Sequence, residues 1–148
     1  MTIMVKKGIP SSEKIWPLFL STGWNDEYAL SPQELSSALF NSWYTVSAYD
    51  DERLVGFGRV VSDGGLHAMI YDLIIDPGYQ ERGIGSQVLE RLVERCLEAN
   101  IRDIQLFCAR GKEEFYRKRG FIARPSDAPG MEYRRAVASH DQSAMNPA

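Results

Sequence analysis

The chain has 148 residues, of which 44% are hydrophobic and 25% are charged, and its formal net charge at pH 7 is −3. This length favours one globular domain with a sizeable core. The slight negative charge argues against nucleic acid or an anionic membrane as the main partner, and it is compatible with a cationic substrate such as an amine.

Two cysteines, Cys96 and Cys108, lie in apolar runs, and neither has a second cysteine or a histidine at metal-ligand or redox spacing. We therefore expect two buried free thiols in a reducing compartment, and no metal site. The N-terminal residues lack the apolar core of a signal peptide, and no stretch reaches the ~18 apolar residues of a membrane-spanning helix. These features predict a cytoplasmic protein with no membrane partner.

The first half of the chain has the pattern of a strand, two helices and an antiparallel meander. In chain order we expect a strand at 3–5, a helix that starts at 10–13 and reaches residue 20, a loop at 22–28, a helix from 31 to 41, and strands at 43–49, 54–61 and 67–76. Ser31 as N-cap, Pro32 at the first helical position and Glu34 three residues after the cap mark the start of the second helix.

The hydrophobic period changes in the second half. Apolar residues recur at three- and four-residue steps from Ile84 to Leu97, which indicates an amphipathic helix, and Asn100 suits a left-handed exit from it. We expect a strand at 101–109, a helix at 112–119, and strands at 121–124 and 131–137. A right-handed crossover through the long helix makes the strand after it parallel to the strand before it.

This order predicts one α/β domain over residues 1–137, with a mixed, mostly antiparallel sheet of about seven strands and four helices on its faces. Residues 138–148 have the composition of a disordered tail.

The turn before the long helix carries the most information about function. Gly83 and Gly85 leave it free of bulky side chains, so backbone N–H groups can face an anion at the positive end of the helix dipole. Arg82 adds a cation and Ser86 a hydroxyl. The turn lacks both the Gly-Lys-Ser/Thr ending of a P-loop and the third small residue of a dinucleotide fingerprint. Taken alone, it is equally compatible with a tight, well-capped turn.

Two motifs resemble those of the GNAT superfamily of N-acetyltransferases. Gln80, Gly83 and Gly85 match its pattern Arg/Gln-x-x-Gly-x-Gly/Ala, and residues 115–121 look like its Phe-Tyr-x-x-x-Gly-Phe. The resemblance covers residues 3–137 and includes the order of elements. It implies a GNAT-type fold with a splay between strands four and five, acetyl-CoA as cosubstrate, and an amine as acceptor. Homodimers are frequent among such proteins, so a homodimer is possible.

Within the superfamily, residues 68–77 and 104–108 look most like the arylalkylamine (serotonin-type) acetyltransferases, which implies a small aryl or alkyl amine as acceptor and direct attack on the thioester. The chain departs from those relatives at Ala109 and Arg110, where they carry Asp or Asn.

The resemblance implies that a strand edge binds the pantetheine arm and that the glycine turn binds the pyrophosphate. The implied cofactor-binding residues are Leu73, Ile74, Ile75, Glu81, Arg82, Gly83, Ile84, Gly85, Ser86 and Tyr116. For the three strand residues the alternative is an ordinary core strand, and both interpretations can hold because side chains pack while the backbone binds.

Tyr116 is the implied general acid. A free phenol has a pKa of ~10 and a thiol ~8.5, so a phenol can protonate the departing thiolate at little cost. The alternative is that Tyr116 only packs beside Phe115. A strand N–H near Leu73 is the expected donor to the acetyl carbonyl.

Asp72 is the implied proton acceptor for the amine, directly or through water, or an attractor of the ammonium group. The alternative is a surface or bulge aspartate. Alternation places His67 on the opposite face from Asp72 unless a bulge intervenes, so His67 is a weak candidate for the base. Trp24, Tyr28 and Tyr71 are the implied substrate-binding residues, because an aromatic, acidic wall suits a cationic amine; for Trp24 the alternative is filling the core.

Two other hypotheses stay open. The chain could be an acetyl-CoA-binding sensor or partner module without turnover, or an unrelated nucleotide-binding α/β domain. Transfer to an amine, and protection by CoA rather than ATP or NAD, separate them from the enzyme.

Overall fold

The computed structural model describes residues 2–135, so the predicted tail at 138–148 lies outside the described part of the chain. The chain divides into two compact units, Met1–Cys108 and Ala109–Ala148. The first unit contains β1 (Ile3–Lys7), α1 (Ser12–Leu20), α2 (Asn25–Tyr28), α3 (Pro32–Phe40), β2 (Tyr44–Asp50), β3 (Arg53–Ser62), β4 (His67–Ile75), the 3-10 turn η1 (Pro77–Tyr79), α4 (Ile84–Glu98) and β5 (Asp103–Leu106). The second contains α5 (Glu113–Arg117).

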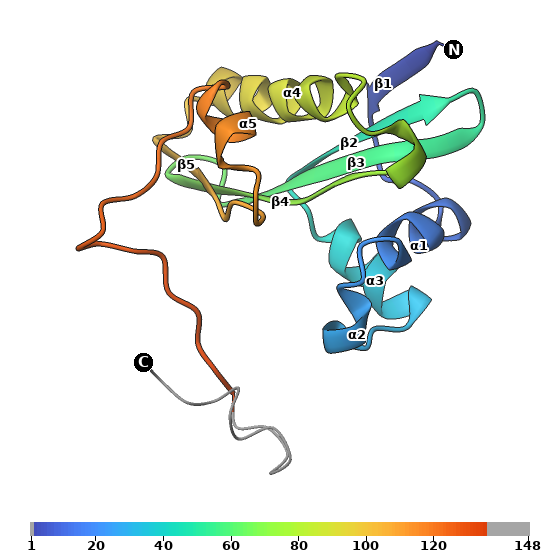
Figure 1. Ribbon diagram of the computed structural model, residues 1–148, viewed down its shortest axis with the longest axis horizontal. Helices are drawn as coiled ribbons and strands as arrows, with labels where there is room; N and C mark the ends of the chain where they lie inside the picture. Colours follow the sequence, from blue (N-terminus) through green and yellow to red (C-terminus); the bar gives the residue numbers. More distant parts are fainter. Residues whose placement is uncertain (1, 136–148) are drawn as a thin grey trace. The chain divides into compact units, whose positions relative to one another are not determined.

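The strands form one mixed sheet in the order β1-β2-β3-β4-β5 (Figure 1). Strands β1 to β4 are antiparallel neighbours, and β5 is parallel to β4. The predicted mixed, mostly antiparallel sheet is confirmed, and so is the parallel pairing across the crossover through α4. The predicted numbers of elements were wrong: the described residues form five strands and five α-helices.

The two missing strands were expected at 121–124 and 131–137. Residues 121–135 contain no strand, and residues 136 and 137 lie outside the described part. Pro125 and Pro129 interrupt this segment, and proline has no N–H to donate to a strand ladder. The strand expected at 101–109 is also shorter, because β5 spans only Asp103–Leu106.

The extra helix is α2, in the segment expected to be a loop. Local polar contacts hold this single turn: the Trp24 N–H donates to Oγ1 of Thr22 at 3.0 Å. The Asn25 side chain accepts from the Leu30 N–H at 2.8 Å and donates to the Leu30 carbonyl at 3.1 Å. Ala29 ends the turn in the left-handed conformation, with φ of 52°.

The other local signals are confirmed. The Ser31 hydroxyl accepts from the Glu34 N–H at 3.1 Å, and the Glu34 carboxylate accepts from the Ser31 N–H at 2.9 Å, which completes the capping box. Asn100 follows α4 with φ of 56°. Cys96 is buried as expected, whereas Cys108 is exposed, so the prediction for that thiol was wrong.

Helix α4 covers one face of the sheet, and α1 and α3 cover the other (Figure 1). Gly58 allows the close approach of α4, because a Cβ there would lie 2.8 Å from Cδ1 of Leu92. On the opposite face, Phe57 and Ile74 belong to a buried cluster with Leu35 of α3 and Phe19 of α1. Both faces of the central strands are therefore packed, which fixes the positions of the strand ends.

Candidate functional site

A β-bulge interrupts β4 at Asp72. Phe57 pairs with Ile74 and Arg59 pairs with Tyr71, so two residues of β4 stand opposite Gly58 alone. Asp72 has φ of 55°, in the left-handed region. The extra residue breaks the alternation of β4. Regular alternation would place Asp72 and His67 on opposite faces of the strand, and the bulge removes this restriction.

The Asp72 carboxylate is ion-paired rather than free on the surface. Nε of Arg59 donates to Oδ2 of Asp72 at 2.7 Å, and the two side chains are only 17% and 22% exposed. Nη1 of Arg59 also donates to the Ala38 carbonyl at 3.2 Å and to the Ser42 hydroxyl at 3.3 Å. Arg59, which the sequence patterns did not single out, thus connects the bulge to the end of α3.

His67 belongs to a different cluster. Its Nδ1 lies 2.8 Å from Oδ2 of Asp103, its register partner on β5, and Nε2 of Gln105 donates to the same carboxylate. Five residues of strand separate His67 from Asp72, which corresponds to roughly 16 Å. The geometry therefore gives His67 a structural ion-pair partner and does not bring it to Asp72.

The second half of β4 has an open edge. Pairing between β4 and β5 ends at Ile70 and Leu106, although β4 continues to Ile75. Within the described residues, the segment 71–75 therefore has no strand partner on the β5 side, as the predicted splay requires. Ile74 is buried with 4% exposure, so its side chain is part of the core, and only the backbone edge remains for a ligand.

Side chains of the turn shape the exit from β4. The Asp76 carboxylate accepts from the Gly78 N–H at 2.8 Å, and the Asp76 carbonyl accepts from the Tyr79 N–H at 2.8 Å. The Gln80 amide group donates to the Ile75 carbonyl at 3.1 Å. These bonds close η1 and lead the chain directly to α4.

The last part of the turn presents the N-terminus of α4. Glu81 and Gly83 are both left-handed, with φ of 64° and 81°. Gly83 is the N-cap, and no side chain caps this end. The N–H groups of Ile84 and Gly85 have no partner within the helix, as for the first turn of any helix. This end of α4 can therefore bind an anion.

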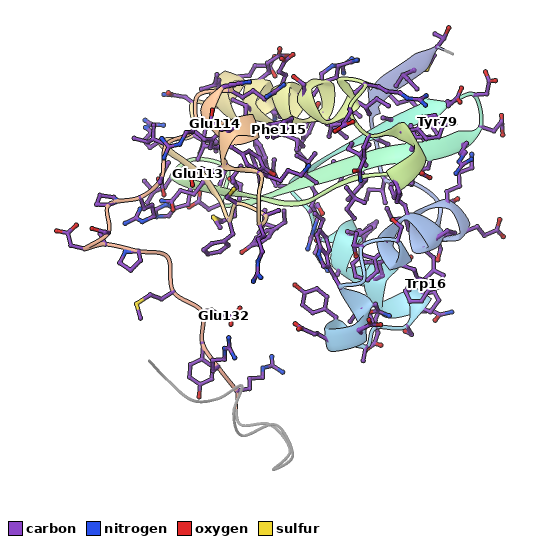
Figure 2. All side chains as sticks on the ribbon, in the orientation of Figure 1. Trp16, Tyr79, Glu113, Glu114, Phe115 and Glu132 are labelled. Carbon is purple, nitrogen blue, oxygen red and sulfur yellow. The ribbon has the colours of Figure 1, made fainter. Side chains whose placement is uncertain are left out.

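Tyr79 anchors this turn, and no sequence pattern had singled it out. Its hydroxyl donates to Oδ2 of Asp50 at 2.6 Å, and this bond raises the pKa of Tyr79 above its ordinary value. The guanidinium carbons of Arg53 and Arg82 lie 5.4 and 5.3 Å from the ring centroid. Nη2 of Arg53 also donates to Oδ2 of Asp76 at 3.0 Å, which raises the pKa of Arg53. Figure 2 labels Tyr79 in this turn.

The candidate substrate residues are all partly or fully exposed. Trp24 and Tyr71 are each 38% exposed and Tyr28 is 63% exposed. The Trp24 ring meets the ring of Phe19 edge-on, with centroids 6.4 Å apart. Trp24 therefore contacts the core residue Phe19 and stays partly exposed, so the core-filling interpretation holds in part, and its role in substrate binding stays a prediction.

Tyr116 lies in α5, in the second unit. Its half-buried ring makes edge-to-face contacts with Phe115 and Phe121, with centroids 5.1 and 5.9 Å apart. The guanidinium carbon of Arg119 lies over the Phe115 ring, 4.0 Å from its centroid. The packing interpretation of Tyr116 is thus correct for its ring, and it leaves open the chemistry of the hydroxyl.

A family model identifies the chain. The model of the acetyltransferase (GNAT) family matches residues 13–121, which include β4, the turn, α4 and α5. The chain belongs to the acetyltransferase (GNAT) family. The predicted superfamily is therefore confirmed.

Individual GNAT proteins agree with this assignment. Probable acetyltransferase TAP2 of Glycine max is 32% identical over 87% of this chain and 61% of its own length. Histone acetyltransferase TAP1 of the same plant is 36% identical over 66% of this chain and 47% of its own length. The chain therefore spans less than two thirds of the length of either curated relative. A GNAT-family acetyltransferase from Streptococcus pneumoniae superposes with a TM-score of 0.78 at 28% identity, over 92% of this chain and 100% of that one.

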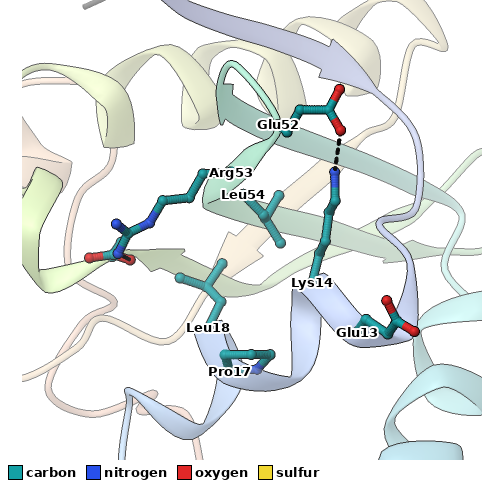
Figure 3. A pocket seen from close by; sticks show the side chains of 8 residues that line it. Glu13, Lys14, Pro17, Leu18, Glu52, Arg53 and Leu54 are labelled. Atoms are coloured by element: carbon teal, nitrogen blue, oxygen red, sulfur yellow. Dashed lines mark hydrogen bonds and ion pairs between the residues drawn. The ribbon is translucent and has the colours of Figure 1, made fainter.

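A separate pocket of about 280 Å³ lies between α1 and the β2–β3 hairpin of this GNAT chain (Figure 3). It is lined by Glu13, Lys14, Pro17, Leu18, Glu52, Arg53, Leu54 and Asp76. None of these residues is among those predicted to bind the cofactor or the substrate. Within residues 2–135, the structure contains no helix that is both long and apolar enough to span a membrane.

Proposed function

We propose that this GNAT chain is an N-acetyltransferase that moves an acetyl group from acetyl-CoA to a primary amine. The observation that carries the proposal is the turn before α4, where left-handed Glu81 and Gly83 precede a helix N-terminus that no side chain caps. Such an end favours an anionic ligand, and it follows directly on the open edge of β4. The two features together suit a ligand with an amide-containing arm and a diphosphate.

The residues present fit acetyl-CoA. Backbone groups of Leu73, Ile74 and Ile75 would hold the amides of the pantetheine arm by strand addition, since the side chain of Ile74 is already used in the core. Backbone N–H groups from Glu81 through Ser86 would bind the diphosphate, with the Arg82 cation nearby. In this arrangement the edge of β4 would bind the pantetheine arm, and the turn would bind the diphosphate.

Acetyl-CoA supplies an acetyl group activated as a thioester. In our proposal the main chain near Leu73 donates a hydrogen bond to the acetyl oxygen as negative charge develops there, a contribution typically worth ~3–4 kcal/mol. The Tyr116 hydroxyl would give its proton to the sulfur as the C–S bond breaks, a nearly balanced transfer because a phenol and a thiol have similar affinities for a proton. The proton that the nitrogen loses once the C–N bond has formed would restore the hydroxyl through water.

The amine must lose a proton before it attacks, and Asp72 is our candidate acceptor. Its Oδ2 is already engaged by Arg59, so Oδ1 would take the proton, directly or through water. The Arg59 cation also reduces the attraction of Asp72 for an ammonium group. The acceptor site would therefore select its amine by shape and ring contacts more than by charge at the bulge.

For the acceptor we propose a small aryl or alkyl amine. The exposed rings of Trp24 and Tyr28 flank two acidic residues on α2, Asp26 and Glu27, and this combination favours a cation with an apolar body. A lysine side chain has the same reactive group, and one relative carries the name of a histone acetyltransferase. A lysine peptide therefore belongs in the amine screen.

Calorimetry with CoA and acetyl-CoA, followed by an amine panel with detection of the released thiol, tests the proposal. Binding together with thiol release on adding an amine supports the enzyme. Tight binding without transfer to any amine, the lysine peptide included, would instead indicate a sensor module. No heat with either form of CoA, together with thermal protection by ATP or NAD, would refute the proposed ligand.

A further inference from the structure

The turn before α4 receives little support from packing. Of residues 77–83, Tyr79 is half-buried and the others are exposed. Glu81 adopts a left-handed conformation that residues other than glycine rarely take, and a Cβ on Gly83 would have no atom within 4 Å. Because burial does not hold this loop, its conformation depends on the few polar contacts that tie it to the sheet.

Tyr79 makes the contacts that reach furthest from the turn. Its hydroxyl bonds to Asp50, which is the register partner of Arg53 at the closed end of the β2–β3 hairpin. Its ring contacts the guanidinium groups of both Arg53 and Arg82, and Arg53 also bonds to Asp76. The β2–β3 hairpin thus binds Asp76 at the start of the turn and also Tyr79, whose ring contacts Arg82.

We propose that Tyr79 is a positioning residue for the diphosphate site: its hydroxyl fixes the turn to Asp50, and its ring holds Arg82 beside the N-terminus of α4. This inference rests on the proposed binding of acetyl-CoA at the same turn. The hydroxyl is protonated near neutral pH, because an ordinary phenol has a pKa of ~10 and the bond to the Asp50 carboxylate raises the pKa of Tyr79 further. The hydroxyl can therefore donate to Asp50 at neutral pH.

The variant Tyr79→Phe removes the bond to Asp50 and keeps an aromatic ring in contact with the two cations. We expect the Kd for CoA to rise about three- to tenfold, the effect of losing part of one hydrogen bond to a charged group. The kcat/KM for acetyl-CoA falls by the same factor. The kcat/KM for S-acetylpantetheine, which has no diphosphate, stays as in the wild type, since that donor does not use the turn.

Tyr44→Phe is the matched control. The Tyr44 ring also lies near two cations, Lys7 at 6.0 Å and Arg95 at 5.9 Å, but Tyr44 is at the opposite end of β2 from Asp50. We expect wild-type kinetics with both donors.

Variants of Asp50 test the other side of the bond. Asp50→Asn keeps a hydrogen-bond acceptor and should retain most of the affinity for CoA, whereas Asp50→Ala should lose as much affinity as Tyr79→Phe. The double variant Tyr79→Phe/Asp50→Ala should bind CoA no more weakly than either single variant.

Equal CoA affinity in the wild type and in Tyr79→Phe would overturn the inference and leave the proposed function intact. An equal fall in kcat/KM for acetyl-CoA and for S-acetylpantetheine would also overturn the inference, since a general structural defect would then be the cause. A wild-type protein that binds no CoA refutes the inference and the proposed function together. The midpoint of thermal unfolding without ligand shows whether each variant is folded.

Discussion

Nε of Arg59 lies 2.7 Å from Oδ2 of Asp72, and this ion pair stands at the bulge of β4 with both side chains largely buried. Asp72 is left-handed there, and Arg59 continues to the carbonyl of Ala38 at the end of α3. One guanidinium group thus connects the irregular part of the central strand to the helical layer on the same side. The bulge, and with it the main chain around Leu73, is held by a specific pair of charges.

Replacing Arg59 by methionine should lower the free energy of unfolding by about 2 kcal/mol, because it leaves a largely buried carboxylate without its partner. Adding Asp72→Asn should restore part of this loss. Urea denaturation measures both. Lys14→Met is the control: Lys14 and Glu52 are 4.0 Å apart with the carboxylate side chain 99% exposed, so the cost there should stay within ~0.5 kcal/mol. Equal losses at the two sites would contradict a special role for the Arg59 pair.

Tyr116→Phe should lower kcat about 100-fold and leave the affinity for CoA unchanged, because the ring contacts with Phe115 and Phe121 do not need the hydroxyl. Steady-state kinetics and calorimetry provide the two readouts. Tyr133→Phe removes a hydroxyl from a residue that is 89% exposed and should change neither. Unchanged kcat in Tyr116→Phe would remove the proposed proton donor.

Gly85→Glu should abolish CoA binding without unfolding the protein. The new carboxylate lies in the first turn of α4, where it competes with an anionic ligand. The same change favours the fold, since glutamate has a higher helix propensity than glycine and suits a helix N-terminus. The affinity for CoA measured by calorimetry should therefore fall, while the midpoint of thermal unfolding should rise. Gly65→Glu, in the β3–β4 connection, adds the same charge away from the turn, and normal CoA binding is expected there.

Gly58→Ala should destabilise the protein by about 1–3 kcal/mol, because the added Cβ would lie 2.8 Å from Leu92 and 3.0 Å from Val88, both fully buried on α4. The midpoint of thermal unfolding should fall by roughly 2–4 °C for each kcal/mol. Gly65→Ala is the control, since a Cβ there has no neighbour within 4 Å. A similar midpoint in both variants would show that α4 can move away from the sheet freely.

Asp63 makes stability depend on pH. Hydrogen bonds from the N–H groups of Gly65 first, and then Leu66 and His67, lower the pKa of its carboxyl below the usual value. A lowered pKa in the folded state means that the stabilisation is present above the unfolded-state pKa and is lost as the pH falls through the folded-state pKa.

We therefore expect Asp63→Asn to have a lower free energy of unfolding than the wild type at pH 7. This difference should shrink once the pH falls below the pKa of an ordinary aspartate. Urea denaturation over a pH series measures this. A difference in the free energy of unfolding that is constant with pH would mean that the negative charge of Asp63 does not stabilise the turn.

The sequence by itself determined the features that depend on neighbours a few residues away. The capping box at Ser31, the amphipathic period of α4 and the left-handed exit at Asn100 are short-range patterns, and the structure has all three. The two motifs that resemble the GNAT superfamily are equally local, and the family model confirms the superfamily that they predicted. The segment 121–135 departs from prediction because its prolines outweigh a short apolar pattern.

Only the tertiary structure decided which polar groups meet. Arg59 and Asp72 are 13 residues apart in sequence, and Asp50 and Tyr79 are 29 apart. Their contacts depend on strand register and on a bulge that shifts the register by one residue, and residue periodicity does not encode either. The bulge gives Asp72 a partner that its position in the sequence did not suggest, and the register brings the β2–β3 hairpin against the turn before α4.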